Sequence, residues 1–143
     1  MKINIPRSAA VKLVEALQKI LFVPGEDESS EPVERPLPFG LKYKLVTDYN
    51  SLATTAAEYE VKRREILKKY GTENEETHEY SIQDEEAKNK ALDEIFGLLK
   101  ENVLIEILKV PTKEIESVGD ESIEISSLDI LLIQTYLVEK EGN

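Results

Sequence analysis

The spacing of hydrophobic residues changes from strict alternation to a helical repeat soon after the start of the chain. Residues 2–5 (KINI) alternate polar and apolar side chains, which predicts a short β-strand. Pro6 ends this strand, because proline cannot donate a hydrogen bond to a neighbouring strand. From Ser8, a suitable N-cap, apolar residues recur at helical spacing and predict a helix to about Leu21 or Phe22. These apolar positions are Ala10, Leu13, Val14, Leu17 and Leu21.

A second, longer helix is predicted from Leu41 to Tyr70, a stretch without proline or glycine that is followed by Gly71. Its apolar residues follow alternating three- and four-residue steps, and Arg63 fills the one missing position. We call these residues the seam of the long helix: Leu45, Tyr49, Leu52, Ala56, Tyr59, Ile66 and Tyr70. We expect the seam to pack on the chain's own helices, with self-association as the alternative.

The second half of the chain predicts a third helix and a strand. Ser81, with Asp84 three residues later, is expected to cap the helix. The apolar residues of this helix are Ala87, Ala91, Leu92, Ile95, Leu98 and Leu99. Val103–Val110 is rich in β-branched residues and stops at Pro111, which favours a strand paired with the N-terminal one. Continuation of the helix through this segment is the alternative.

A last helix is predicted from Leu128 to about Glu139, capped by Ser126 or Ser127. Its inward side is expected to carry Leu128, Leu131, Leu132 and Tyr136. These elements predict a single α+β domain over residues 1–143 that is mainly helical, with one long central helix, three shorter helices and a small sheet.

Acidic residues gather in two segments that lack an apolar pattern. Pro24–Pro38 is rich in proline and carboxylates, so we expect a mobile acidic loop there. Thr72–Glu79 (TENEETHE) is expected to form a turn or a flexible tip between helices. The candidate partner-binding residues in the two segments are Glu26, Asp27, Glu28, Glu31, Glu34, Glu73, Glu75, Glu76 and Glu79.

The charge balance of the chain indicates what kind of partner it binds. The sequence has 18 Lys and Arg against 29 Asp and Glu, a formal net charge of −11. This charge disfavours nucleic acid and anionic membranes and favours a protein partner with a basic surface. The chain has no cysteine, no apolar signal core and no run of about 20 apolar residues, so a cytoplasmic location is expected.

Candidate chemistry is sparse in this sequence. His78 is the single histidine, and its neighbours Glu75, Glu76 and Glu79 match no established metal-binding spacing. Without cysteine and with one histidine, a nucleophilic triad is hard to build. We therefore expect no enzyme activity, no cofactor and no metal. The one basic cluster, at positions 62–64 and 68–69, has Glu58, Glu60 and Glu65 within pairing reach and is expected to be a salt-bridged helix face.

The order of the segments resembles small uncharacterised proteins of tailed phages and prophages. The resemblance lies in a short N-terminal strand, the long helix GLKYKLVTDYNSLATTAAEYEVKRREILKKYG with its acidic turn, the segment LLKENVLIEILKVPTKEI and the closing SSLDILLIQTYLVEK. It covers Gly40 to Lys140, and the acidic insertion at Gly25–Pro36 departs from it. The resemblance implies a phage or prophage origin and supplies no catalytic residues.

Two classes of function remain open. The first is an acidic protein-binding module that inhibits or modulates a host protein, which suits the net charge and the long loop. The alternative is a phage morphogenesis factor or minor virion component, which would suit stable assembly through an apolar helix face. Because the seam is assigned to the core, a monomer is favoured over a homodimer.

Overall fold

The computed structural model describes residues 1–23, 31–116 and 125–139 of the chain. Within these ranges the fold is α+β and mainly helical, with one long central helix and small antiparallel sheets, as the sequence predicted. The elements in chain order are β1 (Lys2–Pro6), α1 (Arg7–Leu21), β2 (Phe22–Val23), β3 (Val33–Glu34), α2 (Phe39–Tyr70), β4 (Thr72–Glu73), β5 (Tyr80–Ser81), α3 (Glu85–Lys100), β6 (Asn102–Glu106), α4 (Thr112–Glu116) and α5 (Ser127–Tyr136).

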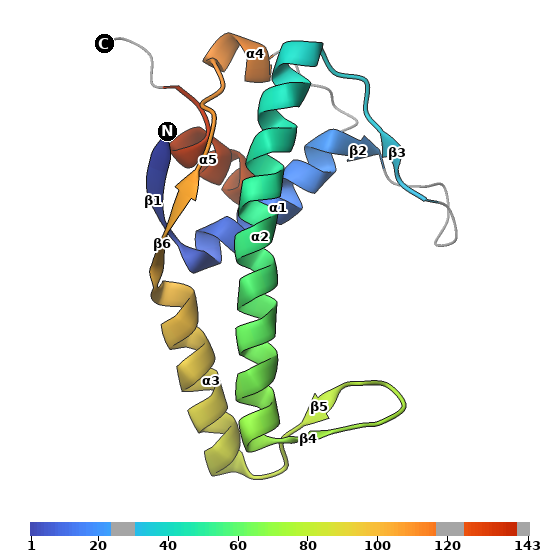
Figure 1. The fold of residues 1–143 in the computed structure, drawn as a ribbon, viewed down its shortest axis with the longest axis vertical. Coiled ribbons are helices and arrows are strands. Elements are labelled where there is room, and N and C mark those ends of the chain that lie inside the picture. The colour runs from blue at the N-terminus through green and yellow to red at the C-terminus, as the bar shows by residue number, and fades with distance from the viewer. Residues whose placement is uncertain (24–30, 117–124, 140–143) are drawn as a thin grey trace.

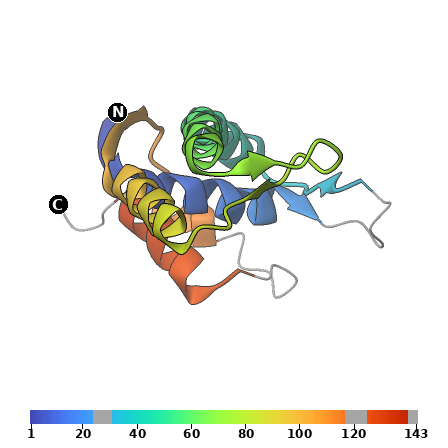
Figure 2. The same ribbon diagram turned by 90° about the horizontal axis from the view of Figure 1, so that it is seen from below.

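The helices lie in layers (Figure 2), with α2 on one side, α1 in the middle and α5 on the other side. The upper part of α2 packs on α1, and its lower part extends beyond the core alongside α3 (Figure 1). The core is therefore concentrated around α1, most of whose apolar side chains are buried.

The predicted pairing of the first strand with the 103–110 segment is confirmed for residues 103–106, and β6 ends at Glu106, before the predicted end at Val110. β1 and β6 are antiparallel, with Ile3 opposite Ile105 and Ile5 opposite Val103. Pro6 belongs to the strand and does not end it. In this ladder the backbone hydrogen bonds join odd-numbered residues of the two strands. The 2.8 Å hydrogen bond from the Arg7 N–H to the Glu101 carbonyl continues that pattern. The missing N–H of Pro6 therefore falls where no ladder bond is made.

The first helix begins directly after β1, at Arg7, and Ser8 is not its N-cap. The Arg7 side chain is buried, and its Nη1 donates to the Leu98 carbonyl at 3.2 Å and to Glu101 Oε2 at 2.8 Å. A buried guanidinium that binds the end of α3 fixes the start of α1 in a way that no capping pattern reveals.

The seam of α2 faces the core, as predicted. Leu45 and Leu52 are fully buried, and Tyr59 is buried near the lower end of the core. Gly71 follows the helix, with an extended backbone (φ −131°), so it does not provide the left-handed turn that glycine often supplies. Glycine is needed here for space, because an added Cβ would lie 2.7 Å from the Ser81 carbonyl oxygen and 2.8 Å from Ile82 Cγ1.

The third helix begins later than predicted. Ser81 belongs to β5, opposite Thr72, and Asp84 occupies the N-cap position of α3. Ala91 and Leu98 are the buried residues of α3, whereas Leu92 from the predicted apolar face is exposed. The lower part of α3 lies beside α2, away from the layers around α1 (Figure 1), and little of its apolar surface is covered there.

The last helix is present, but its inward side was predicted only in part, since Leu132 and Tyr136 are partly buried against the core. Ser126 caps α5 by accepting from the Asp129 N–H at 3.1 Å, as expected. The buried residues are Asp129 and Ile133, whereas Leu128 and Leu131 are 50% and 57% exposed. Asp129 faces inward because Oδ2 pairs with Lys19 Nζ of α1 at 3.1 Å.

Candidate functional site

The predicted acidic loop is partly replaced by a small sheet. Glu26, Asp27 and Glu28 lie outside the described residues. From Val33 the chain forms β3, which pairs with β2 through Phe22 opposite Glu34 and Val23 opposite Val33. The segment predicted as a loop over residues 24–38 therefore contains a short strand, which its composition did not indicate.

A buried arginine attaches this segment to the end of α1. The Arg35 N–H donates to the Leu21 carbonyl at 2.8 Å, and Arg35 Nε donates to the Ile20 carbonyl at 3.0 Å. The last carbonyls of a helix have no partner within the helix, so these bonds satisfy groups that would otherwise need water. The neighbouring Glu34 forms an ion pair with Lys42 of α2, which neutralises one of the predicted partner-binding carboxylates within the chain.

The second acidic segment is an ordered hairpin. β4 and β5 pair with Glu73 opposite Tyr80, and between them the Asn74 side-chain oxygen accepts from the Glu76 N–H at 2.9 Å and the Thr77 N–H at 3.3 Å. His78 closes the turn with a left-handed backbone (φ 59°). The predicted turn is confirmed and the flexible tip is not, because Asx-type bonds fix the loop locally.

The structure does not merge the two acidic segments into one cluster. The β2–β3 sheet and the β4–β5 hairpin project to the same side of α2, but at different heights along it (Figure 1). Glu73 Oε1 lies 3.3 Å from His78 Nδ1, and Glu75, Glu76 and Glu79 are exposed. Each group therefore has to be judged as a separate surface.

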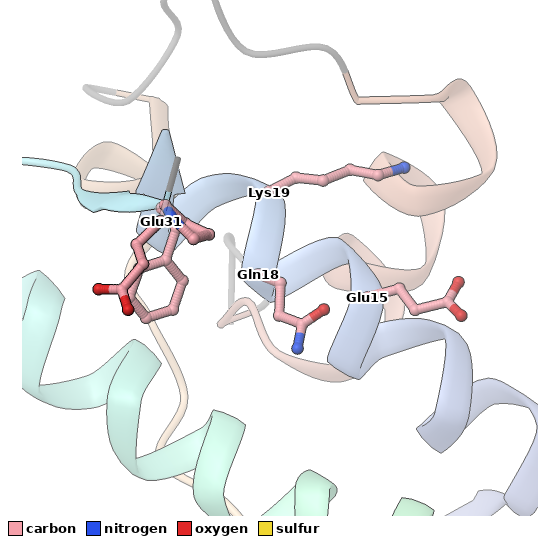
Figure 3. Close-up of a pocket in the computed structure, with 6 residues that line it drawn as sticks. Glu15, Gln18, Lys19 and Glu31 are labelled. Carbon is pink, nitrogen blue, oxygen red and sulfur yellow. The ribbon is translucent and has the colours of Figure 1, made fainter. Parts of the chain in front are cut away.

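The first of these surfaces borders a pocket of about 840 Å³ beside the end of α1 (Figure 3). One wall comes from consecutive turns of α1, and the other comes from the residues that lead into β3. Figure 3 shows Gln18 between the carboxylates of Glu15 and Glu31. The residues that line the pocket are Glu15, Gln18, Lys19, Phe22, Glu31 and Pro32.

The polar contacts of the pocket leave its rim acidic. Lys19 extends away from the pocket toward α5, where it pairs with Asp129 at 3.1 Å. Gln18 Nε2 donates to the Tyr49 hydroxyl of α2 at 3.0 Å, which fixes the side chain beside the pocket. Among the described residues that line the pocket, Glu15 and Glu31 supply carboxylates, and Phe22 and Pro32 contribute apolar surface. An apolar surface with two carboxylates suits the stem and head of a lysine or arginine side chain.

Sequence reasoning found Glu31 in this pocket and missed the rest. Glu15, Gln18 and Phe22 lie three or four positions apart, so they share one side of α1 and its continuation. That spacing was available in the sequence. The sequence did not show that residues 31–32 approach this side of α1, because that approach depends on the pairing of β2 with β3 and on the buried Arg35.

Other charged groups of the described residues carry no comparable site. In the basic cluster of α2, Arg63 pairs with Glu60 at 3.1 Å, as expected, whereas Lys69 pairs with Glu94 of α3 at 3.2 Å, a contact that the sequence did not indicate. Across residues 1–23, 31–116 and 125–139, no three His, Cys, Asp or Glu side chains gather in a way that would hold a metal ion. Among the helices of the same ranges, none is both long and apolar enough to cross a membrane.

Comparison with protein-family models, with curated proteins and with solved structures found no match to this chain.

Proposed function

We propose that this chain is a phage- or prophage-encoded acidic protein-binding module that acts in the host cytoplasm and modulates a host protein with a basic surface. The single observation that carries the proposal is the pocket between α1 and the start of β3, where Glu15 and Glu31 border Phe22 and Pro32. The origin rests on the resemblance in sequence, and the acidic net charge of −11 supports a basic partner.

The pocket fits a protein better than a small molecule. It is an open depression on the surface, and the described residues give it two carboxylates and one amide, with Lys19 held by Asp129. An amphipathic segment with a basic side chain would bury Phe22 and pair with the carboxylates at the rim. The β4–β5 hairpin, with Glu75, Glu76 and Glu79 exposed on the same side of α2, would add long-range attraction during encounter.

The alternative function, a phage morphogenesis factor or minor virion component, is favoured by a different surface. The outer face of α2 exposes Phe39, Tyr43 and Val61, an arrangement that suits assembly with another helix. This face lies apart from the pocket, so the two functions are separable by mutation.

A tagged pull-down from the presumed bacterial host, with and without phage infection, tests the proposal. The wild-type chain is compared with Glu15→Lys/Glu31→Lys in the pocket and with Glu75→Lys/Glu76→Lys in the hairpin. The two variants carry the same change of charge. We expect the wild type to retain a basic protein identified by mass spectrometry, and the purified protein to bind the wild type directly.

The two variants should behave differently. Charge reversal in the pocket should abolish retention, whereas the hairpin variant should keep the equilibrium complex and lose mainly association rate at low salt. Equal retention by the wild type and the pocket variant would refute the pocket as the binding site. Retention of a virion protein only after infection would favour the alternative function.

A further inference from the structure

The long helix has a second regular face that the core does not use. Opposite the seam, eight residues of α2 lie on one face of the helix. The spacings between successive members are four, three, four, seven, four, three and four positions. We call this set the outer stripe of α2: Phe39, Tyr43, Val46, Asn50, Ala57, Val61, Arg64 and Lys68. Phe39 is 82% exposed and Val61 is 58% exposed, and the rings of Phe39 and Tyr43 stack with centroids 6.4 Å apart.

The outer stripe lies on an uncovered side of the fold. In Figure 2, which looks along α2 from below, the other helices all lie on one side of α2. The seam residues Leu45 and Leu52 point toward them and are fully buried. Across the described residues, the opposite side of α2 has no packing element. The stripe exposes four large apolar side chains, and such a group on one face of a helix is typical of an interface: Phe39, Tyr43, Val46 and Val61.

The spacing of the outer stripe fits a second copy of the chain. The steps read the same from both ends, so an antiparallel copy of α2 would meet the same steps in reverse. A twofold axis beside Ala53 and Thr54 would place Val46 opposite Val61 and Asn50 opposite Ala57. A twofold interface requires this self-complementarity. If residue i of one copy contacts residue j of the other, then residue j of the first copy also contacts residue i of the second.

The chemistry of the two ends fits the same pairing. One end of the stripe is aromatic (Phe39 and Tyr43) and the other is cationic (Arg64 and Lys68). The antiparallel arrangement would bring Phe39 to Lys68 and Tyr43 to Arg64 of the second copy, as cation–π pairs. At the centre the small side chain of Ala53 allows two helices to approach closely.

The charge of α2 also permits this contact. The helix carries seven basic and four acidic side chains, whereas the whole chain has a net charge of −11. Two copies that meet along α2 therefore avoid the repulsion that would oppose contact between acidic surfaces. The monomer preference drawn from the sequence concerned the seam, which is buried, and did not consider this opposite face.

We propose that the outer stripe of α2 is a homodimer interface in which two α2 helices pack antiparallel about a twofold axis beside Ala53 and Thr54. The interface is independent of the pocket at the end of α1, so loss of one leaves the other intact. Sedimentation of the full chain over a range of concentrations should show a reversible monomer–dimer equilibrium.

Charge placed in the stripe tests the surface. Val61→Glu should weaken dimerisation at least about tenfold, because it places two carboxylates per dimer in the apolar contact. Leu131→Glu is the matched control on α5, where Leu131 is 57% exposed and outside the stripe, and it should leave the equilibrium unchanged. Circular dichroism and melting of each variant at low concentration report whether the fold is retained.

Disulfide trapping tests the direction of the two helices, since the chain has no cysteine of its own. In the antiparallel pair the two copies of position 46 are about 22 Å apart along the axis, from a rise of ~1.5 Å per residue. Neither Val46→Cys nor Val61→Cys should then cross-link with itself, whereas a mixture of the two variants should form a disulfide heterodimer.

Three results would overturn the proposal. The first is a wild type that stays monomeric at every concentration. The second is a Val61→Glu variant that dimerises as the wild type does. The third is that each single-cysteine variant cross-links with itself and the mixture forms no additional product. The last result would indicate a parallel pair.

Discussion

Asp48 Oδ1 accepts a hydrogen bond of 2.7 Å from the backbone N–H of Leu108, which joins the middle of α2 to the segment after β6. The Asp48 side chain is fully buried, and its Oδ2 has no hydrogen-bond partner among the described residues. Burial raises the pKa of Asp48 to about 6, although the Leu108 bond and the charges of Lys109 and the N-terminal amino group lower it in part. Ionised Asp48 therefore costs the folded state free energy.

The raised pKa of Asp48 makes stability depend on pH in a defined direction. Well below pH 3.8 the carboxyl is protonated in both the folded and the unfolded state, and its titration does not change the free energy of unfolding. As pH rises from 3.8 to about 6, the unfolded chain loses this proton first, so the free energy of unfolding falls. Above pH 6, the decrease in the free energy of unfolding that is due to Asp48 approaches about 3 kcal/mol. Denaturant unfolding of the wild type and Asp48→Asn across this range measures it.

The asparagine variant should lack this component. We expect the stability of the wild type, relative to Asp48→Asn, to decrease as pH rises from 4 to 7. Asp93→Asn, the same change at an exposed position of α3, controls for the lost charge and should follow the wild-type profile. Parallel profiles for the wild type and Asp48→Asn would show that the carboxyl is not held protonated by burial.

Periodicity located the helices more reliably than it located their inward faces. The seam of α2 follows three- and four-residue steps and was placed correctly, since Leu45 and Leu52 are fully buried. The pattern of α5 (SLDILLIQTY) is apolar on nearly every side, so it cannot select a face. The Lys19–Asp129 ion pair helps to set the face of α5, and that contact joins residues far apart in the sequence.

Leu52 lies at the centre of the seam, and its replacement tests whether the seam is the core. Leu52→Ala should lower the free energy of unfolding by roughly 2–5 kcal/mol, because a buried cavity is left behind. Leu104→Ala makes the same chemical change at an exposed position and should cost less than about 0.5 kcal/mol. Equal small losses in urea denaturation would argue against a buried seam.

Two glycines of this chain should respond oppositely to alanine. Gly71→Ala should destabilise the fold by about 1–3 kcal/mol, because the new Cβ would collide with the backbone of Ser81. Gly97→Ala should instead stabilise it by about 0.5–1 kcal/mol, since Gly97 lies inside α3 with no neighbour within 4 Å of the added Cβ. Thermal melts of both variants test the contact between β5 and the end of α2. If both alanines stabilised the fold, that contact would be wrong.

The candidate site was only partly accessible from sequence. Composition indicated that acidic residues would lie outside the core, and Glu31 and the β4–β5 glutamates are exposed. Composition could not show that Glu34 pairs with Lys42 or that Arg35 is buried at the end of α1. Both contacts depend on how residues 31–38 return to α1 after an acidic segment, and acidic composition alone does not determine that path.

Site-specific photo-crosslinking in the presumed host tests the binding pocket most directly. A photoreactive residue replaces Gln18, which lies between Glu15 and Glu31, and in a second variant replaces Asn89, an exposed residue of α3 outside the pocket. We predict that position 18 captures one basic host protein, that position 89 does not, and that Glu15→Lys/Glu31→Lys removes the product. The same products from both positions, or no product from position 18 in cells where the chain is active, would contradict binding through this pocket.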